Sequence, residues 1–187
     1  GIDARATYEA RDGAIWLGAA VDWFSERGHK GGVLSILPDH QVHHTPPDAL
    51  RYIYGIGQMS DASIWIGSYR GLNVFKQSTW THIDTSEALL SRIDAVYTPP
   101  NGELWLGHRN QGIFKYDGHT WQQFDSRHGL ANNATRSILK THDGTIWAVS
   151  AQSISRFDGT TWTRSALPPE LYIDLRGTLK QSKDSTL

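Results

Sequence analysis

Tryptophan recurs along this chain at a near-constant spacing, each time inside the same short motif. Four anchor tryptophans lie 49, 40 and 42 residues apart, and they are Trp16, Trp65, Trp105 and Trp147. Each follows an Asp or Asn by four residues and has an aliphatic residue directly before it. A second series follows the last three anchors by 15 or 16 residues, at Trp80, Trp121 and Trp162. A period of about 40 to 45 residues indicates repeated small β-sheets.

The last repeat shows the expected strands most clearly. Four segments rich in strand-forming residues lie at 137–141, 145–150, 153–157 and 160–164. The pairs Asp143-Gly144 and Asp158-Gly159 predict tight hairpins of type I′, in which both central residues have positive φ. Each repeat is therefore predicted to be a four-stranded antiparallel meander, which is one blade of a β-propeller.

The predicted fold class is all-β, with four blades and the start of a fifth that belong to, or assemble into, a larger ring. The blades are expected at about residues 2–45, 50–84, 92–125 and 135–166, and the fifth starts at about 171–187. The tryptophans are interpreted as packing residues, because strand aromatics build contacts between sheets. We expect the four anchors at equivalent second-strand positions and mostly buried.

The two faces of such an array are predicted to be unequal. Both hairpins inside a blade are tight and offer little for binding. The loops between second and third strands and the links between blades are longer, and strand alternation places them all on the opposite face. We call this the loop face and the other the turn face, and we expect a binding site on the loop face.

The first blade carries an insertion on the loop face. Gly18 and Gly32 are 14 residues apart, whereas the matching glycines of the next two blades are 4 and 5 apart, so about residues 19–31 are inserted. The insertion brings two aromatic residues and an arginine to the expected site, although packing on a neighbouring blade is the alternative. The candidate ligand-binding residues are Trp23, Phe24, Arg27, Tyr69, Arg70, His108, Arg109, Gln111, His128 and Gln152.

The motifs resemble the two-component regulator propeller repeat. The resemblance is carried by residues 143–147, the Gly-Leu and Gly-Ile pairs at 71–72 and 112–113, the segment 116–121, and the linker 128–135, with Ala131 where proline is usual. Departures are Ala62 at a turn glycine, Ala148 and Val149 in place of Leu-Gly, and Val42 where a second tryptophan would align in the first repeat.

The resemblance implies a periplasmic or other extracytoplasmic sensor domain. Such repeats typically precede an immunoglobulin-like domain, a membrane helix and a kinase module elsewhere in a longer chain. The family signature is structural, so it assigns no ligand-binding residue.

Known catalytic signatures are missing from the sequence. There is no Gly-x-Ser-x-Gly elbow, phosphate-binding loop or His-Glu-x-x-His motif. The repeated aspartates fall in hairpin turns, away from the loop face. His40, His43 and His44 alternate sides of a strand and do not easily converge on a metal ion. The prediction is no catalytic residue, no metal and no cofactor.

Composition excludes further classes of protein. A net charge of -1 argues against nucleic acid as a partner, because nucleic-acid domains usually carry a basic surplus. No segment approaches the roughly 20 apolar residues of a membrane span. The absence of cysteine excludes disulfides and thiolate metal sites but leaves the compartment open.

Three functions remain open on the sequence. The leading hypothesis is a ligand-sensing propeller, not an enzyme, that binds a small molecule or carbohydrate on the loop face. The second is a lyase resembling streptogramin lyase, with His108 or His128 as the base. The third is an architectural propeller that docks another protein through Trp23 and Phe24.

The C-terminal residues 180–187 align with 97–104, so a fifth anchor tryptophan is expected next. Open blade flanks need a cover. Either the chain is part of a longer seven- or eight-bladed ring, or two copies form a homodimer that closes one.

Overall fold

The computed structural model describes residues 4–19, 32–37, 39–44, 50, 52–150, 153–169, 171–173 and 178–181. The first sheet contains β1 (Ala4–Glu9), β2 (Ile15–Ala19), β3 (Gly32–Ile36) and β4 (Gln41–His44). The second contains β5 (Ile53–Gln58), β6 (Ile64–Ser68), β7 (Gly71–Lys76) and β8 (Thr79–His82). The third contains β9 (Ile93–Tyr97), β10 (Leu104–His108), β11 (Ile113–Tyr116) and β12 (Trp121–Phe124).

The fourth sheet contains β13 (Ser137–Lys140), β14 (Ile146–Val149), β15 (Ile154–Phe157) and β16 (Trp162–Ser165). A two-stranded sheet follows, made of β17 (Leu171–Ile173) and β18 (Leu179–Gln181). Two short 3-10 helices, η1 (Glu87–Leu90) and η2 (Ser126–His128), lie in the links that follow β8 and β12. Within these described ranges, neither helix has the length or hydrophobicity to cross a membrane.

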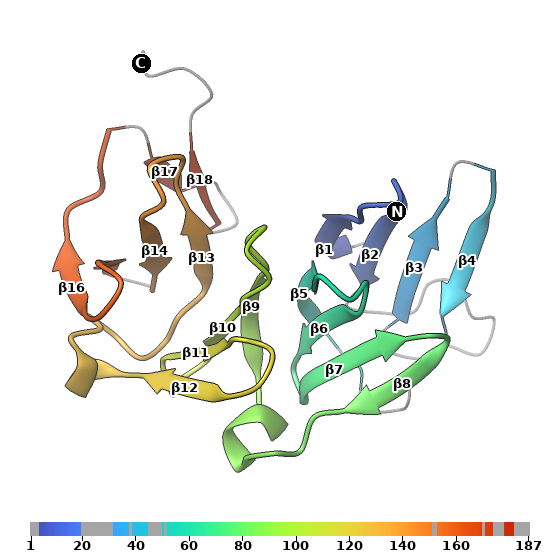
Figure 1. The fold of residues 1–187 in the computed structure, drawn as a ribbon, viewed down its shortest axis with the longest axis horizontal. Coiled ribbons are helices and arrows are strands. Elements are labelled where there is room, and N and C mark those ends of the chain that lie inside the picture. The colour runs from blue at the N-terminus through green and yellow to red at the C-terminus, as the bar shows by residue number, and fades with distance from the viewer. Residues whose placement is uncertain are drawn as a thin grey trace.

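Each of the four larger sheets is an antiparallel meander in which every strand pairs with its neighbours in sequence. The sheets stand side by side in chain order along an open arc, from the blue first sheet to the orange fourth (Figure 1). The first strands β5 and β9 of neighbouring sheets pack against each other, as do β1 and β5. This places the first strands inside the arc and the fourth strands outside it.

The hairpin turns differ in type from the prediction at both Asp-Gly pairs of the fourth sheet, because neither Asp143 nor Asp158 has a positive φ. The amide of Gly144 donates to the Thr141 carbonyl, and the amide of Thr141 donates to the Thr145 carbonyl. Gly144 has a φ of 89°, but Asp143 has none in the positive range. This is a three-residue loop with a left-handed glycine, so the type I′ prediction is wrong here. The Asp143 carboxylate instead accepts from the Thr145 amide at 3.0 Å, which stabilises this turn.

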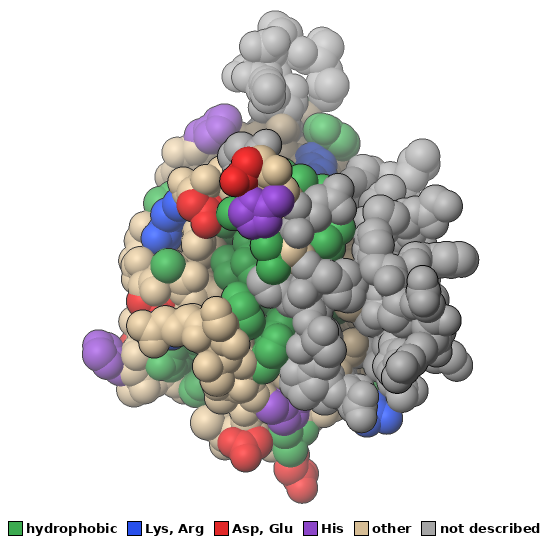
Figure 2. Space-filling model, turned by 90° about the vertical axis from the view of Figure 1, so that its right-hand side faces the viewer, with side chains coloured by type: hydrophobic (Ala, Val, Ile, Leu, Met, Phe, Trp, Pro, Cys, Tyr) green, Lys and Arg blue, Asp and Glu red, His purple; other side chains and the backbone are tan. Residues whose placement is uncertain are grey.

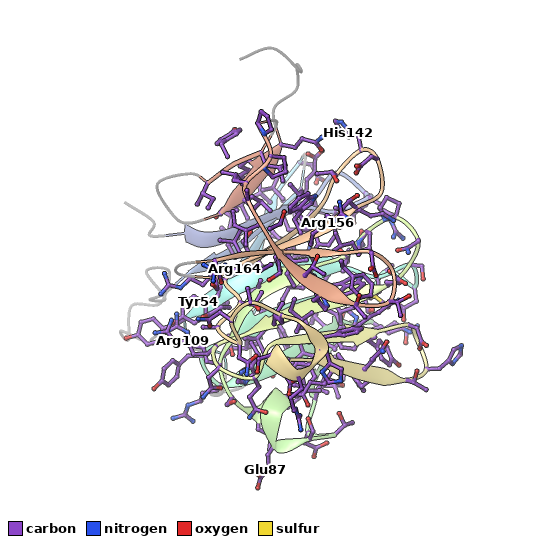
Figure 3. All side chains as sticks on the ribbon, turned by 90° about the vertical axis from the view of Figure 1, so that its left-hand side faces the viewer. Tyr54, Glu87, Arg109, His142, Arg156 and Arg164 are labelled. Carbon is purple, nitrogen blue, oxygen red and sulfur yellow. The ribbon has the colours of Figure 1, made fainter. Side chains whose placement is uncertain are left out.

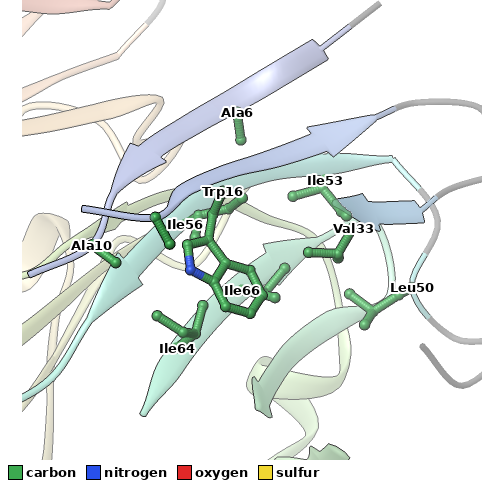
Figure 4. Packing of buried hydrophobic residues seen from close by; sticks show 10 residues of the cluster. Ala6, Ala10, Trp16, Val33, Leu50, Ile53, Ile56, Ile64 and Ile66 are labelled. Atoms are coloured by element: carbon green, nitrogen blue, oxygen red, sulfur yellow. The ribbon is translucent and has the colours of Figure 1, made fainter. Parts of the chain in front are cut away.

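The anchor tryptophans occupy equivalent positions, as predicted. Each is the second residue of the second strand in its sheet, and they are 7, 9, 0 and 7% exposed. Each packs against the next sheet along the chain. Rings of Trp65 and Trp121 lie 6.3 Å apart, and rings of Trp105 and Trp162 lie 6.1 Å apart. Each of these second-series tryptophans therefore packs against the anchor of the preceding sheet. Figure 4 shows Trp16 beside Ile64 and Ile66 of the second sheet.

Glycines two residues after the anchors allow this close approach of neighbouring sheets. A Cβ at Gly67 would lie 2.7 Å from Cγ2 of Ile93, and one at Gly107 would lie 2.8 Å from the Thr135 carbonyl oxygen. Such distances are too short for real carbon contacts, so these positions require glycine. The fourth sheet has Val149 at this position, packed with Leu171 and Leu179.

The first sheet differs from the others on its outer flank, which is the side turned away from the second sheet. Its register pairs Ile36 with Gln41, in the same way that Phe75 pairs with Trp80. Gln41 and not Val42 therefore holds the position of the second tryptophan, because four residues separate the paired positions in both sheets. Ile15 and Leu17 stay partly exposed, whereas their equivalents in the second sheet, Ile64 and Ile66, are 3 and 0% exposed. Figure 2 views the molecule from this side and shows hydrophobic side chains in its middle.

Candidate functional site

The loop face and the turn face lie on opposite sides of the molecule. Figure 3 shows Tyr54 and Arg109 on one side and His142, in a hairpin turn, on the other. The links of the loop face include the long segments after β8 and β12, each with a 3-10 helix. The described loops therefore have the unequal lengths that the sequence predicts.

A cavity of about 500 Å³ opens on the loop face between the second and third sheets. Its size is in the range of small-molecule sites. Four of the predicted site residues meet here: Tyr69 and Arg70 from the loop after β6, and His108 and Arg109 from the end of β10. We call this the loop-face cavity, and its lining residues are Tyr69, Arg70, Leu90, Ser91, Arg92, His108, Arg109 and Asn110.

One buried carboxylate contacts two arginines of the cavity, Arg92 and Arg109. The side chain of Asp94, on β9, is only 6% exposed, and its Oδ1 accepts from Nε of Arg92 at 2.5 Å. Its other oxygen, Oδ2, lies 3.6 Å from Nη1 of Arg109, whose side chain is 47% exposed. One buried negative charge thus faces two guanidinium groups, which is the pairing that buried carboxylates require.

Tyrosines lie in and beside the cavity wall, where Tyr69 is the one that lines the cavity among the described residues. The guanidinium carbon of Arg92 lies 4.1 Å from the ring centroid of Tyr54, which is a cation–π contact. Tyr69 is 54% exposed and Tyr52 is 37% exposed, and their rings meet edge to face at 6.2 Å. Exposed tyrosines supply apolar ring surface and a hydroxyl without a large loss of side-chain entropy on binding.

His108 lies inside the loop rather than on its surface, with 1% of its area exposed. Its Nδ1 accepts from the amides of Asn110 and Gln111 at 3.1 and 3.0 Å, and its Nε2 contacts Ser91 Oγ at 2.8 Å. Two amide donors on Nδ1 place the ring proton on Nε2. Ser68 and Ser150 occupy the same repeat position and also close their loops. His108 therefore holds the shape of the loop.

Two other predicted site residues lie outside the loop-face cavity. The amide of Gln111 caps His108, and its carbonyl accepts from Nε2 of Gln123. His128 ends η2, where its Nδ1 lies 2.9 Å from Asp125 Oδ1. The Arg127 guanidinium and the His128 ring hold the pKa of Asp125 at about 2. Four predicted residues lie outside the described part of the chain: Trp23, Phe24, Arg27 and Gln152.

The sequence motifs did not reveal the residues that position Arg92 and Arg109. Tyr54 and Asp94 occupy matching positions near the starts of β5 and β9, and Arg92 directly precedes β9. A charged residue inside an apolar strand was the available signal, because Asp94 sits between Ile93 and Ala95. The repeat motif gave no reason to connect it with the loop after β10.

The turn face also carries a cavity, which corrects the expectation that its tight turns leave little room for binding. This cavity measures about 530 Å³ and lies between the third and fourth sheets. Asp143 and Asp158 line it together with Lys115, Lys140 and Arg156, so acidic and basic groups are mixed.

Metal ligands do not gather within the part of the chain that the structure describes. Groups of three or more His, Cys, Asp or Glu side chains with suitable geometry are absent from these residues. His40 contacts Asp39 at 2.6 Å, and both side chains are exposed.

Comparison with known proteins gives no match to a protein family and none to a curated protein. Solved structures do match. The extracellular domain of the putative hybrid two component system BT3049 from B. thetaiotaomicron superposes with a TM-score of 0.73 at 19% identity. The match covers 95% of this chain and 26% of that one. The fold is a β-propeller arc.

Two further solved structures match this propeller and agree with the fold. The extracellular domain of BT4673 from the same organism gives a TM-score of 0.71 at 19% identity, covering 92% of this chain and 23% of that one. Virginiamycin B lyase from Staphylococcus aureus gives 0.65 at 15% identity, covering 97% and 64%. The chain thus spans about a quarter of the length of the sensor domains. The predicted all-β fold class is confirmed, and each four-stranded sheet is one blade.

Proposed function

We propose that this propeller arc is a ligand-sensing module that binds a small molecule or carbohydrate in the loop-face cavity. The observation that carries the proposal is the convergence of Tyr69, Arg70, Arg92 and Arg109 from two blades around one cavity. Polar groups that converge in a cavity of this size are typical of ligand sites. Residues that serve packing alone would not collect charged side chains on one face.

The proposal includes an extracytoplasmic location in a two-component signalling protein. It is supported by the extracellular sensor domains to which the blades are similar. Ligand occupancy would be passed to a kinase module elsewhere in a longer chain through rearrangement of blades or subunits. The further blades of the ring come from that longer chain or from a second copy.

A lyase is the second candidate, and the similarity to virginiamycin B lyase favours it. The geometry of both candidate bases argues against it. The two ring nitrogens of His108 contact Asn110 in its own loop and Ser91 in the link before β9, and His128 is bound to Asp125 at the end of η2. A general base needs a nitrogen directed at the substrate. Docking of another protein through Trp23 and Phe24 remains a third hypothesis.

A pair of variants at His108 separates the sensor from the lyase. His108→Asn keeps an acceptor for the amides of Asn110 and Gln111, whereas His108→Leu keeps the volume and leaves those amides unpaired. Unpaired buried donors cost about 1–3 kcal/mol each. We expect His108→Asn to unfold near the wild-type temperature and His108→Leu to unfold at a lower one.

Ligand binding is measured on the same proteins by thermal shift with a library of sugars, organic acids and lactones. A sensor retains ligand binding in His108→Asn and shows no turnover of any compound. Turnover of a lactone that His108→Asn abolishes would instead establish the lyase. A library in which every compound leaves the unfolding temperature unchanged would contradict the binding proposal.

A further inference from the structure

The charges around the loop-face cavity do not balance among the described residues. Three arginines line it, and the Asp94 carboxylate contacts two of them, Arg92 and Arg109. Within the described part of the chain, the guanidinium group of Arg70 has no ion-pair partner, and its backbone amide donates to Ser68 Oγ. The described wall of the cavity therefore carries an excess of positive charge.

The arginines are held in different ways, and this difference matters for binding. Arg92 is fixed by Asp94 through Nε and by the ring of Tyr54, so its position is set before any ligand arrives. Arg109 lies at the longer distance of 3.6 Å from Asp94 and is half exposed. Asp94 orients the group without satisfying its five donors. A preorganised cation loses little conformational freedom when it binds an anion.

The remaining wall suits the uncharged part of a ligand. Tyr69 presents more than half of its surface to solvent, and Leu90 is also exposed at 41%. Ser91 and Asn110 add hydroxyl and amide groups to the same lining. An apolar ring face beside polar groups fits a compact polyhydroxylated body, and the arginine side fits a carboxylate or sulfate group.

We propose that the loop-face cavity recognises an acidic saccharide, whose carboxylate or sulfate group binds between Arg70 and Arg109 and whose ring lies against Tyr69. This proposal rests on the proposed sensor function and adds the chemical class of its ligand. Guanidinium groups bind both anions through paired hydrogen bonds, which neutral sugars cannot accept with equal strength. The cavity of about 500 Å³ has room for one or two sugar rings.

The test is titration of the ¹⁵N-labelled chain, followed by NMR, with three kinds of probe. Glucuronate and galacturonate carry a carboxylate, glucose 6-sulfate carries a sulfate, and glucose and galactose are the neutral controls. We expect the acidic sugars to shift the signals of Tyr69, Arg70 and Arg109, with a dissociation constant at least tenfold below that of the neutral sugars. Affinity should fall as salt is raised, because exposed charges are screened.

Matched variants assign the effect to the cavity. Arg70→Gln and Arg109→Gln should each weaken acidic sugars by about tenfold or more, since hydrogen bonds to charged groups contribute about 1.5–3 kcal/mol. Arg164→Gln removes an exposed arginine from β16, outside the cavity lining, and should leave the affinity unchanged. Arg109→Lys keeps the charge and should recover only part of the affinity.

Three results would overturn the proposal, and they differ in what they leave standing. Neutral sugars that bind as tightly as acidic ones, with binding lost in Tyr69→Ala but not in Arg109→Gln, would exclude the anion and keep the sensor. Sodium sulfate that shifts the same signals as strongly as the sulfated sugar would exclude a saccharide. Failure of all probes in this cavity, with a library ligand bound elsewhere, would reject the assignment of this cavity.

Discussion

The repeat determines the position of single residues in this propeller, and the surrounding loop determines their hydrogen bonds and exposure. His108 shows the difference. It occupies the position of Ser68 and Ser150, and like them it accepts hydrogen bonds from amides of the loop that follows its own strand. Its expected place on the loop face made it a candidate base, but burial and two amide donors make it a structural group. The exposed Arg109 beside it is the residue with free surface.

Trp105 should be the most costly anchor to replace. It is fully buried, and its ring meets the rings of Phe124, Phe157 and Trp162. Trp105→Ala should lower the free energy of unfolding by about 3–5 kcal/mol, because large core cavities carry that cost. Denaturant unfolding followed by tryptophan fluorescence measures it. Trp105→Phe provides a folded variant if the alanine protein does not fold.

The control for Trp105 is Trp80, which is half-buried and whose ring centroid lies 4.9 Å from that of Phe75, with the two rings tilted. Trp80→Ala removes the same number of atoms from a more exposed position, so it should lower the free energy of unfolding by clearly less than Trp105→Ala does. Equal losses for the two variants would mean that burial in the propeller core does not determine the contribution of a tryptophan.

At the scale of elements, the local sequence predicts where the strands lie. It does not predict the conformation of every turn between them. Gln77 and Ser78 both have positive φ and form a two-residue hairpin without glycine. The Asp143-Gly144 pair, which predicts that turn type, forms a longer loop instead. Glycine therefore marks two situations here, a turn that needs a left-handed residue and a site where another backbone passes close by.

Two glycines with similar backbone angles separate these situations. Gly112 has a φ of 87° and Gly118 a φ of 100°. A Cβ at Gly112 would overlap the carbonyl oxygen of Phe124, whereas one at Gly118 meets no atom within 4 Å. Gly118→Ala should cost about 1–2 kcal/mol for the left-handed conformation alone. Gly112→Ala should lower the free energy of unfolding by more, since the overlap displaces the loop that holds His108.

Unfolding midpoints in urea measure the two glycine variants under identical conditions. The structure requires a larger loss for Gly112→Ala, accompanied by changes in the NMR signals of Arg109 and Gln111. A loss at Gly112 no greater than that at Gly118 would show that the β10–β11 loop adjusts freely.

For the whole molecule, the open arc leaves the outer flank of the first blade without a neighbouring sheet among the described residues. Ile15 and Leu17 lie where equivalent residues of the other blades are buried by an anchor tryptophan. Partly exposed aliphatic surface of this kind favours association. We expect the 187-residue chain to associate into a homodimer that covers this flank.

Light scattering after size exclusion tests the homodimer. The expected mass is about twice the 20.9 kDa of one chain. Leu17→Glu places a charge on the flank and should shift the mass to that of a monomer. Leu167→Glu introduces the same charge at an exposed position outside the strands and should leave the dimer intact. A wild-type monomer that unfolds cooperatively would refute the dimer.

The sequence by itself determined the number of blades, their strands and the burial of the anchor tryptophans. These features depend on alternation and turns between residues close in sequence, so a regular spacing reveals them. Only the tertiary structure decided that Tyr54 and Asp94 hold the arginines of the loop-face cavity and that Gln41 stands at the position of a tryptophan. Those contacts depend on how neighbouring blades rotate and approach one another, and that geometry is set by packing across residues far apart in the chain.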